Sequence, residues 1–405
     1  MTMLLVNRRP LLDRLPQWFP DAADELVVFT DPSALAGRDA DAVARSVRHL
    51  EIADDYDGPA ATERLAELCR AYDVRRILTV AEGDLVRAAR LRRAFGLPGQ
   101  DEESALAFTH KHTMKAAAAA GGIPVAPMRY VTDAPGLLDF ADAHGFPLVV
   151  KRLTGGGAVG MSVLADRPAL RRFLEERAGE GEPPAMLAEA WIKGEVYHVN
   201  GVMADGVLLH GWPALYLNTQ WANYHTSAPL VSGMLPADDP LCRRLVDATA
   251  EVVAALPAAP GVLPFHAELF HTPDDEIVLC EIACRAGGAG IVEVHELSFG
   301  LNLYQAGLLG QAGRSDQVRW HEPGPAHGHG WFLPRAGTLR RIPEHCPLPG
   351  AVRYRTSGVP GRHYPGPRSA NDSVAQLIFA LPDTHDLPGA LRTVQDWWLD
   401  AVRWD

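Results

Sequence analysis

The chain has 405 residues, which is enough for two or three packed units with a sizeable apolar core. Apolar residues make up 47% and charged residues 22%, as is ordinary for a soluble globular protein. The net charge of −12 argues against nucleic acid or an anionic membrane as a partner, because both favour a basic surface. An anionic ligand would therefore need a dedicated pocket.

Targeting signals and metal-binding cysteines are also not expected. The apolar run Met1–Val6 is too short for a signal-peptide core, and no segment approaches the roughly 18–20 apolar residues of a membrane span. The five cysteines are scattered and odd in number, and Cys280 and Cys284 lack a second pair of zinc ligands. We therefore expect a cytoplasmic protein with reduced thiols.

The first hundred residues alternate strand-like and helix-like segments. Apolar runs predict buried strands at Met3–Val6, Leu26–Thr30 and Ile77–Val80. Helical spacing predicts helices over Thr62–Tyr72 and Glu82–Phe95. Strands that alternate with helices indicate a parallel sheet covered by helices, so the expected fold class is α/β.

From about Glu102 the pattern changes. One long helix is predicted over Ser104–Ala120, followed by short strands. These strands are expected at Met128–Val131, Pro147–Arg152, Met161–Val163, Leu187–Ile192, Val196–Met203 and Val207–Trp212. A long loop is then expected from Pro213 to Pro236, because this segment is rich in polar and aromatic residues.

The rest of the chain is predicted to hold a helix, a hairpin and a mixed C-terminal segment. The helix is expected over Pro240–Leu256, and the hairpin pairs His266–Phe270 with Ile277–Ile282. After His329 the signals are those of strands and turns, with a final helix near Leu391–Val402. Trp397, Trp398 and Trp404 are interpreted as packing that helix on the core, with a homodimer interface as the alternative.

Lys151 marks the first chemically informative segment. It ends an apolar run and is followed at once by a glycine-rich loop of residues 154–160. An ammonium group beside closely spaced backbone N–H groups suits a polyphosphate. Lys111, in the long predicted helix, is a second basic candidate. Taken singly, Lys151 is more simply a solvated strand end, and the loop is at least as simply a flexible hairpin turn. The loop matches neither the P-loop pattern nor the dinucleotide-binding fingerprint.

The predicted hairpin carries an acidic pair. Glu268 and Glu281 lie on antiparallel neighbours, so both carboxylates can face one side, a suitable mount for magnesium. Arg285 follows four residues later and could clamp a transferring phosphoryl group. The alternative for the two glutamates is a solvated hairpin face.

These motifs, in this order, resemble the ATP-grasp superfamily, and within it the carboxylate–amine ligases that include the L-amino-acid ligases. The resemblance covers most of the chain. It is carried by residues 97–99, the helix containing Lys111, and residues 121–127, 146–160, 189–194, 268 and 281–288.

The resemblance implies an ATP-grasp architecture and divides the chain into four parts. Residues 1–105 would form an N-terminal α/β domain with a parallel sheet. Residues 106–190 would form the small ATP-grasp subdomain with the glycine-rich lid, and residues 191–320 the large subdomain with the metal-binding hairpin, so that the two clamp ATP. Residues 321–405 would form a C-terminal domain packed on the core.

The resemblance also implies roles for individual residues. ATP would be bound by Lys111, Lys151, Gly155, Gly156, Gly157, Glu189, Ala190, Trp191, Ile192 and Glu195. Glu268 and Glu281 would ligate Mg²⁺, or Mn²⁺ in its place, and Arg285 would be the catalytic group that stabilises the phosphoryl group and the tetrahedral intermediate.

Two positions depart from the superfamily pattern. Many members have an asparagine metal ligand two residues after the second glutamate, where this chain has Ala283. Many also have a glutamate where this chain has Val196, which leaves Glu195, His198 or Asn200 as candidates for the ribose contact.

The substrates are expected to lie between the glycine turn that starts at Gly287 and Gly288 and the long loop. Side chains expected there are Trp221, Asn223, Tyr224, His225 and Ser227, with His266, Trp331 and Arg335 nearby. Both His225 and His266 could equally be structural, and His327 and His329 are interpreted as solvated imidazoles in a turn.

The expected function is therefore an ATP-dependent ligase. It would convert a small carboxylate into an acyl phosphate and join it to an amine, with an amino acid as one substrate. The alternatives are a carboxylase or formyl-transferring relative, an enzyme that transfers the phosphoryl group to an alcohol, and a nucleotide-binding module without turnover.

Overall fold

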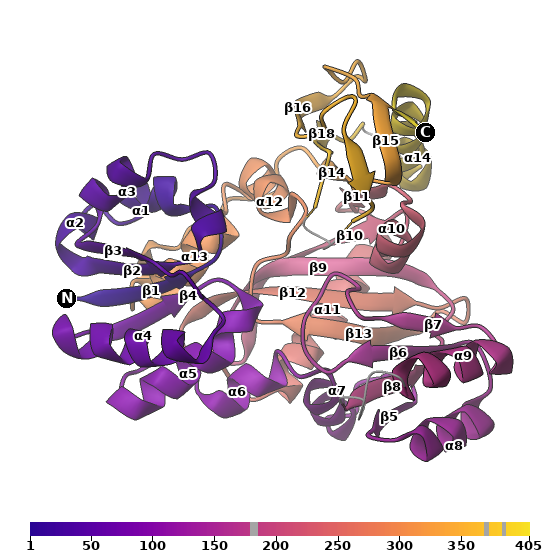
Figure 1. The fold of residues 1–405 in the computed structure, drawn as a ribbon, viewed down its shortest axis with the longest axis horizontal. Coiled ribbons are helices and arrows are strands. Elements are labelled where there is room, and N and C mark those ends of the chain that lie inside the picture. Colours follow the sequence, from indigo (N-terminus) through magenta and orange to yellow (C-terminus); the bar gives the residue numbers. More distant parts are fainter. Residues whose placement is uncertain (179–184, 368–371, 383–385) are drawn as a thin grey trace.

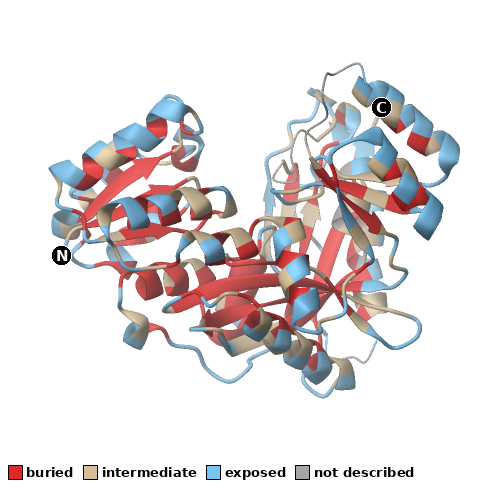
Figure 2. Cartoon of the chain, turned by 90° about the horizontal axis from the view of Figure 1, so that it is seen from below, coloured by how far each residue is buried: buried red, intermediate tan, exposed pale blue. Residues whose placement is uncertain are grey.

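The computed structural model describes residues 1–178, 185–367, 372–382 and 386–405 (Figure 1). In these ranges the strands form a four-stranded parallel sheet, one four-stranded and one eight-stranded antiparallel sheet, and a three-stranded sheet. Figure 2 shows that the sheet strands are mostly buried, whereas the helices expose one side to solvent. None of the helices in these ranges combines the length and apolar character that crossing a bilayer requires.

The N-terminal sheet is parallel, as predicted, with the strand order β3-β2-β1-β4. Its strands are β1 (Met3–Asn7), β2 (Leu26–Thr30), β3 (His49–Ile52) and β4 (Arg76–Thr79). β1 and β2 are buried throughout, which explains their continuous apolar sequences. β3 was not predicted, because its residues alternate in polarity at the edge of the sheet.

Helices cover both faces of this sheet. One face packs on α4 (Pro59–Ala71) and α5 (Glu82–Phe95). The other packs on α13 (Leu303–Gln311), which returns from much later in the chain, together with α1 (Leu15–Trp18), α2 (Ala22–Glu25) and α3 (Ala40–Ser46). The chain runs outward from β1 to β3 and then returns to β4 on the other side of β1. The carboxyl ends of β1 and β4 therefore flank the point where the strand order reverses, which is where open α/β sheets bind ligands.

The single helix predicted over Ser104–Ala120 is wrong. The structure has two helices, α6 (Glu102–Ala107) and α7 (Lys111–Ala120). The break occurs because the His110 side chain caps α7, its Nδ1 accepting a hydrogen bond from the Thr113 backbone N–H (3.3 Å). Lys111 thus becomes the first residue of α7.

The small antiparallel sheet has the strand order β5-β8-β6-β7. Its strands are β5 (Met128–Val131), β6 (Leu148–Arg152), β7 (Ser162–Leu164) and β8 (Met186–Ala190), close to the predicted ranges. Two helices that were not predicted, α8 (Ala134–His144) and α9 (Arg167–Ala178), cover one of its faces.

The large antiparallel sheet has eight strands in the order β13-β12-β9-β10-β11-β14-β18-β16. The strands from the middle of the chain are β9 (Glu195–Ala204), β10 (Val207–Tyr216), β11 (Leu230–Met234), β12 (Val262–His271) and β13 (Ile277–Ala283). Those from the C-terminal segment are β14 (His327–Phe332), β16 (Ala351–Thr356) and β18 (Ala375–Ala380). One face packs on α11 (Pro240–Ala255) and the other on α12 (Ile291–Phe299) and α13. This sheet is continuous past residue 321, and the division of the chain into four domains stays a prediction.

The long loop predicted from Pro213 to Pro236 is wrong. β10 continues to Tyr216, α10 (Gln220–Thr226) follows with Thr219 as its N-cap, and β11 returns to pair with β10. Every residue of β11 is buried, because the strand lies inside the sheet between β10 and β14. The polar and glycine residues of this segment resemble a loop when the sequence is considered without the neighbouring strands.

The turn with two solvated imidazoles predicted at His327 and His329 is also wrong. Both residues lie in β14 and are buried, paired between β11 and β18. A Cβ at Gly328 would lie 2.6 Å from the Phe379 ring, so the glycine permits close packing rather than a turn.

The final helix is confirmed as α14 (Leu387–Ala401), and it packs on the core as interpreted from the tryptophans. Trp398 is buried and stacks on Phe332 with ring centroids 4.0 Å apart. A small sheet of β17 (His363–Pro365), β15 (Ala336–Arg341) and β19 (Arg403–Trp404) completes this part of the chain.

The buried histidines make the stability of the fold depend on pH. Burial lowers the pKa of His329 to about 3, below the ordinary value of about 6.5 that applies in the unfolded chain. Between these values the unfolded chain binds more protons, so the free energy of unfolding falls as the pH decreases through this window. We expect the urea midpoint, followed by circular dichroism, to fall from pH 7 to pH 4.5, and to fall less steeply in His329→Gln. Parallel pH curves for the two proteins would contradict this assignment.

Candidate active site

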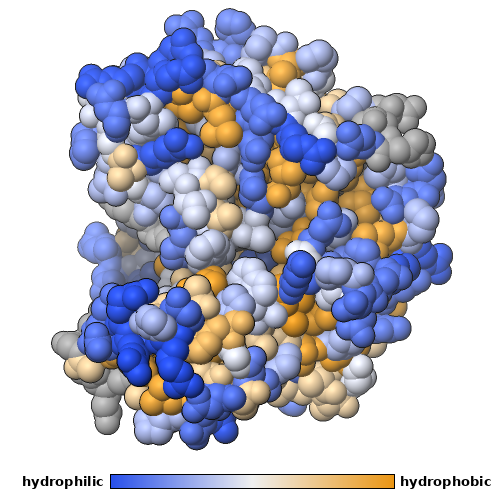
Figure 3. Space-filling view, turned by 90° about the vertical axis from the view of Figure 1, so that its right-hand side faces the viewer, coloured by the Kyte–Doolittle hydropathy of each residue, from blue (hydrophilic) through white to orange (hydrophobic). Residues whose placement is uncertain are grey.

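A cleft lies between the small sheet and the large sheet, next to the glycine-rich loop that joins β6 to β7. Most of the residues predicted to bind ATP and metal line it together: Lys111, Lys151, Gly155, Gly156, Gly157, Glu189, Ala190, Trp191, Ile192, Glu268 and Glu281. They come from α7, both sheets and the loop. Figure 3 shows the face of the molecule seen from the right of Figure 1, where apolar side chains gather between hydrophilic upper and lower edges.

Lys111 ties three elements of the cleft together. Its Nζ donates a hydrogen bond to the carbonyl oxygen of Gly155 (2.7 Å) in the glycine loop. The same nitrogen lies 2.7 Å from Oε2 of Glu281 on β13. The start of α7, the glycine loop and the acidic hairpin are therefore held by one ammonium group.

Glu189 is buried and ion-paired with two lysines, Lys115 and Lys151, the second at 2.5 Å. Although burial alone would raise the pKa of Glu189, the two ammonium groups lower it, so the carboxylate is ionised. Lys115 was missed by the sequence analysis, because a lysine among alanines resembles a solvated helix face. Its spacing of four residues from Lys111 was the available signal, since both lie on one face of α7.

Glu268 and Glu281 are direct partners across β12 and β13, as predicted for the hairpin. Burial alone would raise the pKa of Glu281, but the ammonium groups of Lys111 and Lys151 lower it to about 2. A facing pair of carboxylates suits Mg²⁺, which usually takes one or two carboxylates and fills its remaining positions with water and phosphate oxygens. In the described ranges no cluster of three or more acidic, histidine or cysteine side chains is placed to hold a metal.

Arg285 pairs with a residue that the sequence analysis missed. Its Nε and one terminal nitrogen each lie 3.1 Å from Oε2 of Glu82, at the start of α5 just beyond the carboxyl end of β4. A Cβ added at Gly156 would lie 3.7 Å from the Arg285 guanidinium, so this pair reaches the glycine loop. No local pattern marks Glu82, because the contact joins residues 203 positions apart.

His266 lies behind the acidic pair rather than in the cleft. Its Nε2 is 3.3 Å from Oε1 of Glu268, and its Nδ1 is 2.8 Å from Oδ1 of Asn200. Asn200 in turn bonds His198 (2.6 Å), which bonds the Ser232 hydroxyl (2.7 Å). This buried chain of hydrogen bonds fixes the orientation of the Glu268 carboxylate.

The remaining predicted residues do not join the cleft. Glu195 is exposed at the start of β9 and accepts a hydrogen bond from the Tyr197 hydroxyl (2.9 Å). His225 is exposed on α10, where its ring stacks on Trp221, which does line the cleft. Ser227 ends α10 in a left-handed conformation. The side chains of Asn223 and Tyr224 lie outside the described residues.

Gly287 and Gly288 line a second cavity, which shares no lining residue with the cleft. This cavity lies between the N-terminal sheet, the glycine turn of residues 287–290 and the C-terminal strands. Trp331, expected near the substrates, also lines it.

The chain is similar over most of its length to an amino acid ligase. The L-arginine-specific L-amino acid ligase of Bacillus subtilis is 26% identical over 366 residues, which cover 86% of this chain and 85% of the relative. The crystal structure of an L-amino acid ligase from Bacillus licheniformis matches with a TM-score of 0.73 at 16% identity, covering 100% of this chain and 98% of that one. No family model matches the chain.

A second solved structure extends the comparison to a nucleotide complex. The biotin carboxylase domain of the Hydrogenobacter thermophilus 2-oxoglutarate carboxylase, crystallised with MgADP and bicarbonate, has a TM-score of 0.65 at 14% identity, covering 100% of this chain and 90% of that one. The chain has the ATP-grasp fold. The ATP-grasp fold expected from the order of the sequence motifs is thereby confirmed, and the resemblance to amino acid ligases holds in sequence and in structure.

The packing around Gly287 generates a prediction with a matched control. A Cβ at Gly287 would lie 2.6 Å from Ile291, 2.7 Å from Asn200 and 3.0 Å from His266, whereas a Cβ at Gly288 would meet nothing within 4 Å. We expect Gly287→Ala to lower the free energy of unfolding by about 1–3 kcal/mol through overpacking, and Gly288→Ala to leave it nearly unchanged. Urea denaturation of both variants measures this, and equal midpoints would contradict the tight packing of Gly287 on the His266 network.

Proposed function

We propose that this ATP-grasp protein is an ATP-dependent ligase that forms an amide bond between a carboxylate and an amine, with an amino acid as one substrate. The observation that carries the proposal is the direct pairing of Glu268 with Glu281 beside Lys111 and below the glycine loop. The similarity to amino acid ligases over most of the chain supports the same reaction class.

The basic residues of the cleft would bind the phosphates of ATP. Lys111 and Lys151 already face it, each paired with a glutamate, and phosphate oxygens would replace or share those pairings. Glu268 and Glu281 would hold Mg²⁺, which neutralises phosphate charge when it is bound. The loop of residues 155–157 would close over the phosphates and exclude water.

Adenine would lie against the segment that follows β8. The backbone N–H groups of Ala190 and Trp191 already donate to the carbonyls of Pro127 (2.9 Å) and Pro147 (3.3 Å), which leaves Ile192 as the donor for the base. A contact from Glu189 to adenine stays a prediction, and it requires that Glu189 give up part of its pairing with the two lysines. A ribose contact from Glu195 also stays a prediction.

The reaction would proceed in two steps. A substrate carboxylate oxygen attacks the γ-phosphorus of ATP, and ADP leaves, which forms an acyl phosphate. The amine nitrogen then attacks the acyl carbon, loses a proton, and inorganic phosphate leaves. Arg285 lies beside the glycine loop and two residues before Gly287 in the wall of the second cavity, and it would stabilise the transferring phosphoryl group and the tetrahedral intermediate.

Three finer expectations remain predictions of this proposal: Mn²⁺ can replace Mg²⁺, the protein forms a homodimer, and it acts in the cytoplasm. All five cysteines are free in the described structure, as expected for a reducing compartment.

The test is a matrix of amino acids and small carboxylic acids incubated with ATP and Mg²⁺, followed by phosphate release and product mass. The ligase is supported by phosphate release that needs both an acid and an amine, with a product mass equal to their sum minus water. Phosphate release without an amide product would favour a carboxylase or a formyl-transferring enzyme. Formation of ADP without free phosphate would favour an enzyme that transfers the phosphoryl group to an alcohol. ATP binding without release would favour a nucleotide-binding module.

Glu281→Gln tests the metal pair directly. Because this change removes one ionised ligand from a charge-balanced cleft, we expect kcat to fall by at least about 100-fold, the loss typical of one strong electrostatic contact to a transition state. Glu276→Gln is the matched control, since Glu276 is exposed beside the same hairpin turn, and it should retain full activity. Comparable activity in the two variants would contradict the assignment of Glu281.

A further inference from the structure

The second cavity is strongly basic, although the chain as a whole carries a net charge of −12. Its volume is about 750 Å³. Residues of the N-terminal part of the chain and of the C-terminal strands line it, and Figure 2 shows these two parts on opposite sides of the molecule. The charged residues that line the cavity are Arg8, Arg9, Arg14, Arg38, Glu293, Glu296, Arg353 and Arg355.

Most of these charges are neutralised within the protein. Arg8 binds Asp57 and Asp84 (2.8 Å each), Arg14 binds Glu296 (2.8 Å), Arg38 binds Asp13 (2.8 Å) and Arg353 binds Glu293 (2.7 Å). Both glutamates of the lining are thus already paired with arginines. A cationic ligand would therefore find no unpaired carboxylate among the residues that line the cavity.

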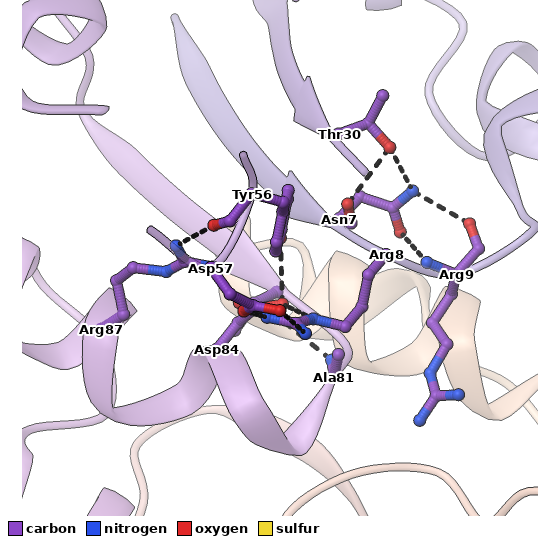
Figure 4. Close-up of polar contacts among 10 residues, drawn as sticks. Asn7, Arg8, Arg9, Thr30, Tyr56, Asp57, Ala81, Asp84 and Arg87 are labelled. Carbon is purple, nitrogen blue, oxygen red and sulfur yellow. Dashed lines mark hydrogen bonds and ion pairs between the residues drawn. The ribbon is translucent and has the colours of Figure 1, made fainter. Parts of the chain in front are cut away.

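Arg9 differs from these arginines. Its Nε is buried without a hydrogen-bond partner in the described structure, and neither Arg9 nor Arg355 forms an ion pair there. Figure 4 shows the Arg9 side chain extending away from the cluster around Arg8, Asp57 and Asp84. A buried donor without a partner costs free energy, and this cost is recovered when an anion binds to it.

The backbone of Arg9 is fixed in place. The Asn7 side chain accepts a hydrogen bond from the Arg9 N–H (3.0 Å) and donates one to the Arg9 carbonyl (2.9 Å). Asn7 is itself buried and bonded to Thr30 (Figure 4). Arg9 is therefore a preorganised binding group at the carboxyl end of β1, beside the point where the strand order of the sheet reverses.

The wall of the cavity also includes a segment next to the proposed reaction site. This segment is the turn of residues 287–290, which follows Arg285 along the chain. A substrate whose reacting carboxylate lies near Arg285 can therefore extend past the glycine turn toward Arg9.

We propose that this cavity binds an amino acid with an acidic side chain, and that Arg9 binds the side-chain carboxylate. The proposal rests on the ligase function and adds a substrate class to it. The side chain preferred here would thus be opposite in charge to the substrate named for the L-arginine-specific relative from Bacillus subtilis. A cationic side chain would meet the unpaired Arg9 and Arg355 and be repelled.

The experiment compares L-glutamate and L-aspartate with their neutral analogues, L-glutamine and L-asparagine, and with L-arginine and L-lysine, each against a panel of amines. We expect kcat/KM to be at least about tenfold higher for an acidic amino acid than for its neutral analogue, because a charged hydrogen bond is worth more than a neutral one. O-phospho-L-serine is included, and a preference for it would overturn the carboxylate assignment.

The Arg9→Gln variant tests whether Arg9 binds the side-chain carboxylate of the substrate. We expect the KM of the acidic substrate to rise about 10–100-fold, the usual effect of losing one charge-assisted contact, with a much smaller change in the KM of ATP. Arg9→Lys should restore part of the affinity. Arg45→Gln removes the same charge from an exposed position on α3 and should change neither constant.

The outcomes separate this inference from the ligase proposal. Turnover of neutral or basic amino acids, with an unchanged KM in Arg9→Gln, would overturn the acidic substrate class and leave the ligase standing. If no pair is turned over, calorimetry with L-glutamate and L-aspartate tests the cavity by itself. Binding that weakens in Arg9→Gln and not in Arg45→Gln would support the proposal that the cavity binds an acidic amino acid. No binding by the unmodified protein would overturn that proposal.

Discussion

The pairing of buried lysines with buried carboxylates is the interaction on which the nucleotide cleft depends. Burying one unpaired charge costs several kcal/mol. Lysines that would bind a polyphosphate must therefore be neutralised by carboxylates when no polyphosphate is bound. Lys115 and Lys151 share Glu189, and Lys111 holds Glu281. The same carboxylate that neutralises Lys111 is therefore a candidate ligand for the metal that accompanies the phosphates.

The position of the acidic pair also depends on residues outside the cleft. Glu268 is positioned by a buried chain of hydrogen bonds that runs through His266 and Asn200 toward Ser232 on β11. Gly287 leaves room for that chain, because any side chain there would meet His266 and Asn200. The geometry of the acidic pair thus depends on strands that contribute no charge to the cleft.

The N-terminal sheet supplies groups to the reaction side through its topology. Its strand order reverses between β1 and β4, so the segments after both strands lie at one edge. The segment after β4 provides Glu82, which holds Arg285, and the segment after β1 provides Arg9, which faces the basic cavity. One sheet therefore contributes to both the proposed phosphoryl-transfer side and the inferred substrate side.

The sequence by itself determined the local features: the buried strands of the parallel sheet, the glycine loop after Lys151, and the hairpin that pairs Glu268 with Glu281. Each is set by residue periodicity or by a tight turn between neighbours, so it can be predicted from a short window. Only the tertiary structure decided that Lys115 binds Glu189, that Glu82 binds Arg285, and that His329 is buried in a strand. Those contacts join residues 74 and 203 positions apart in the first two cases, and no local pattern records which distant segments the fold brings together.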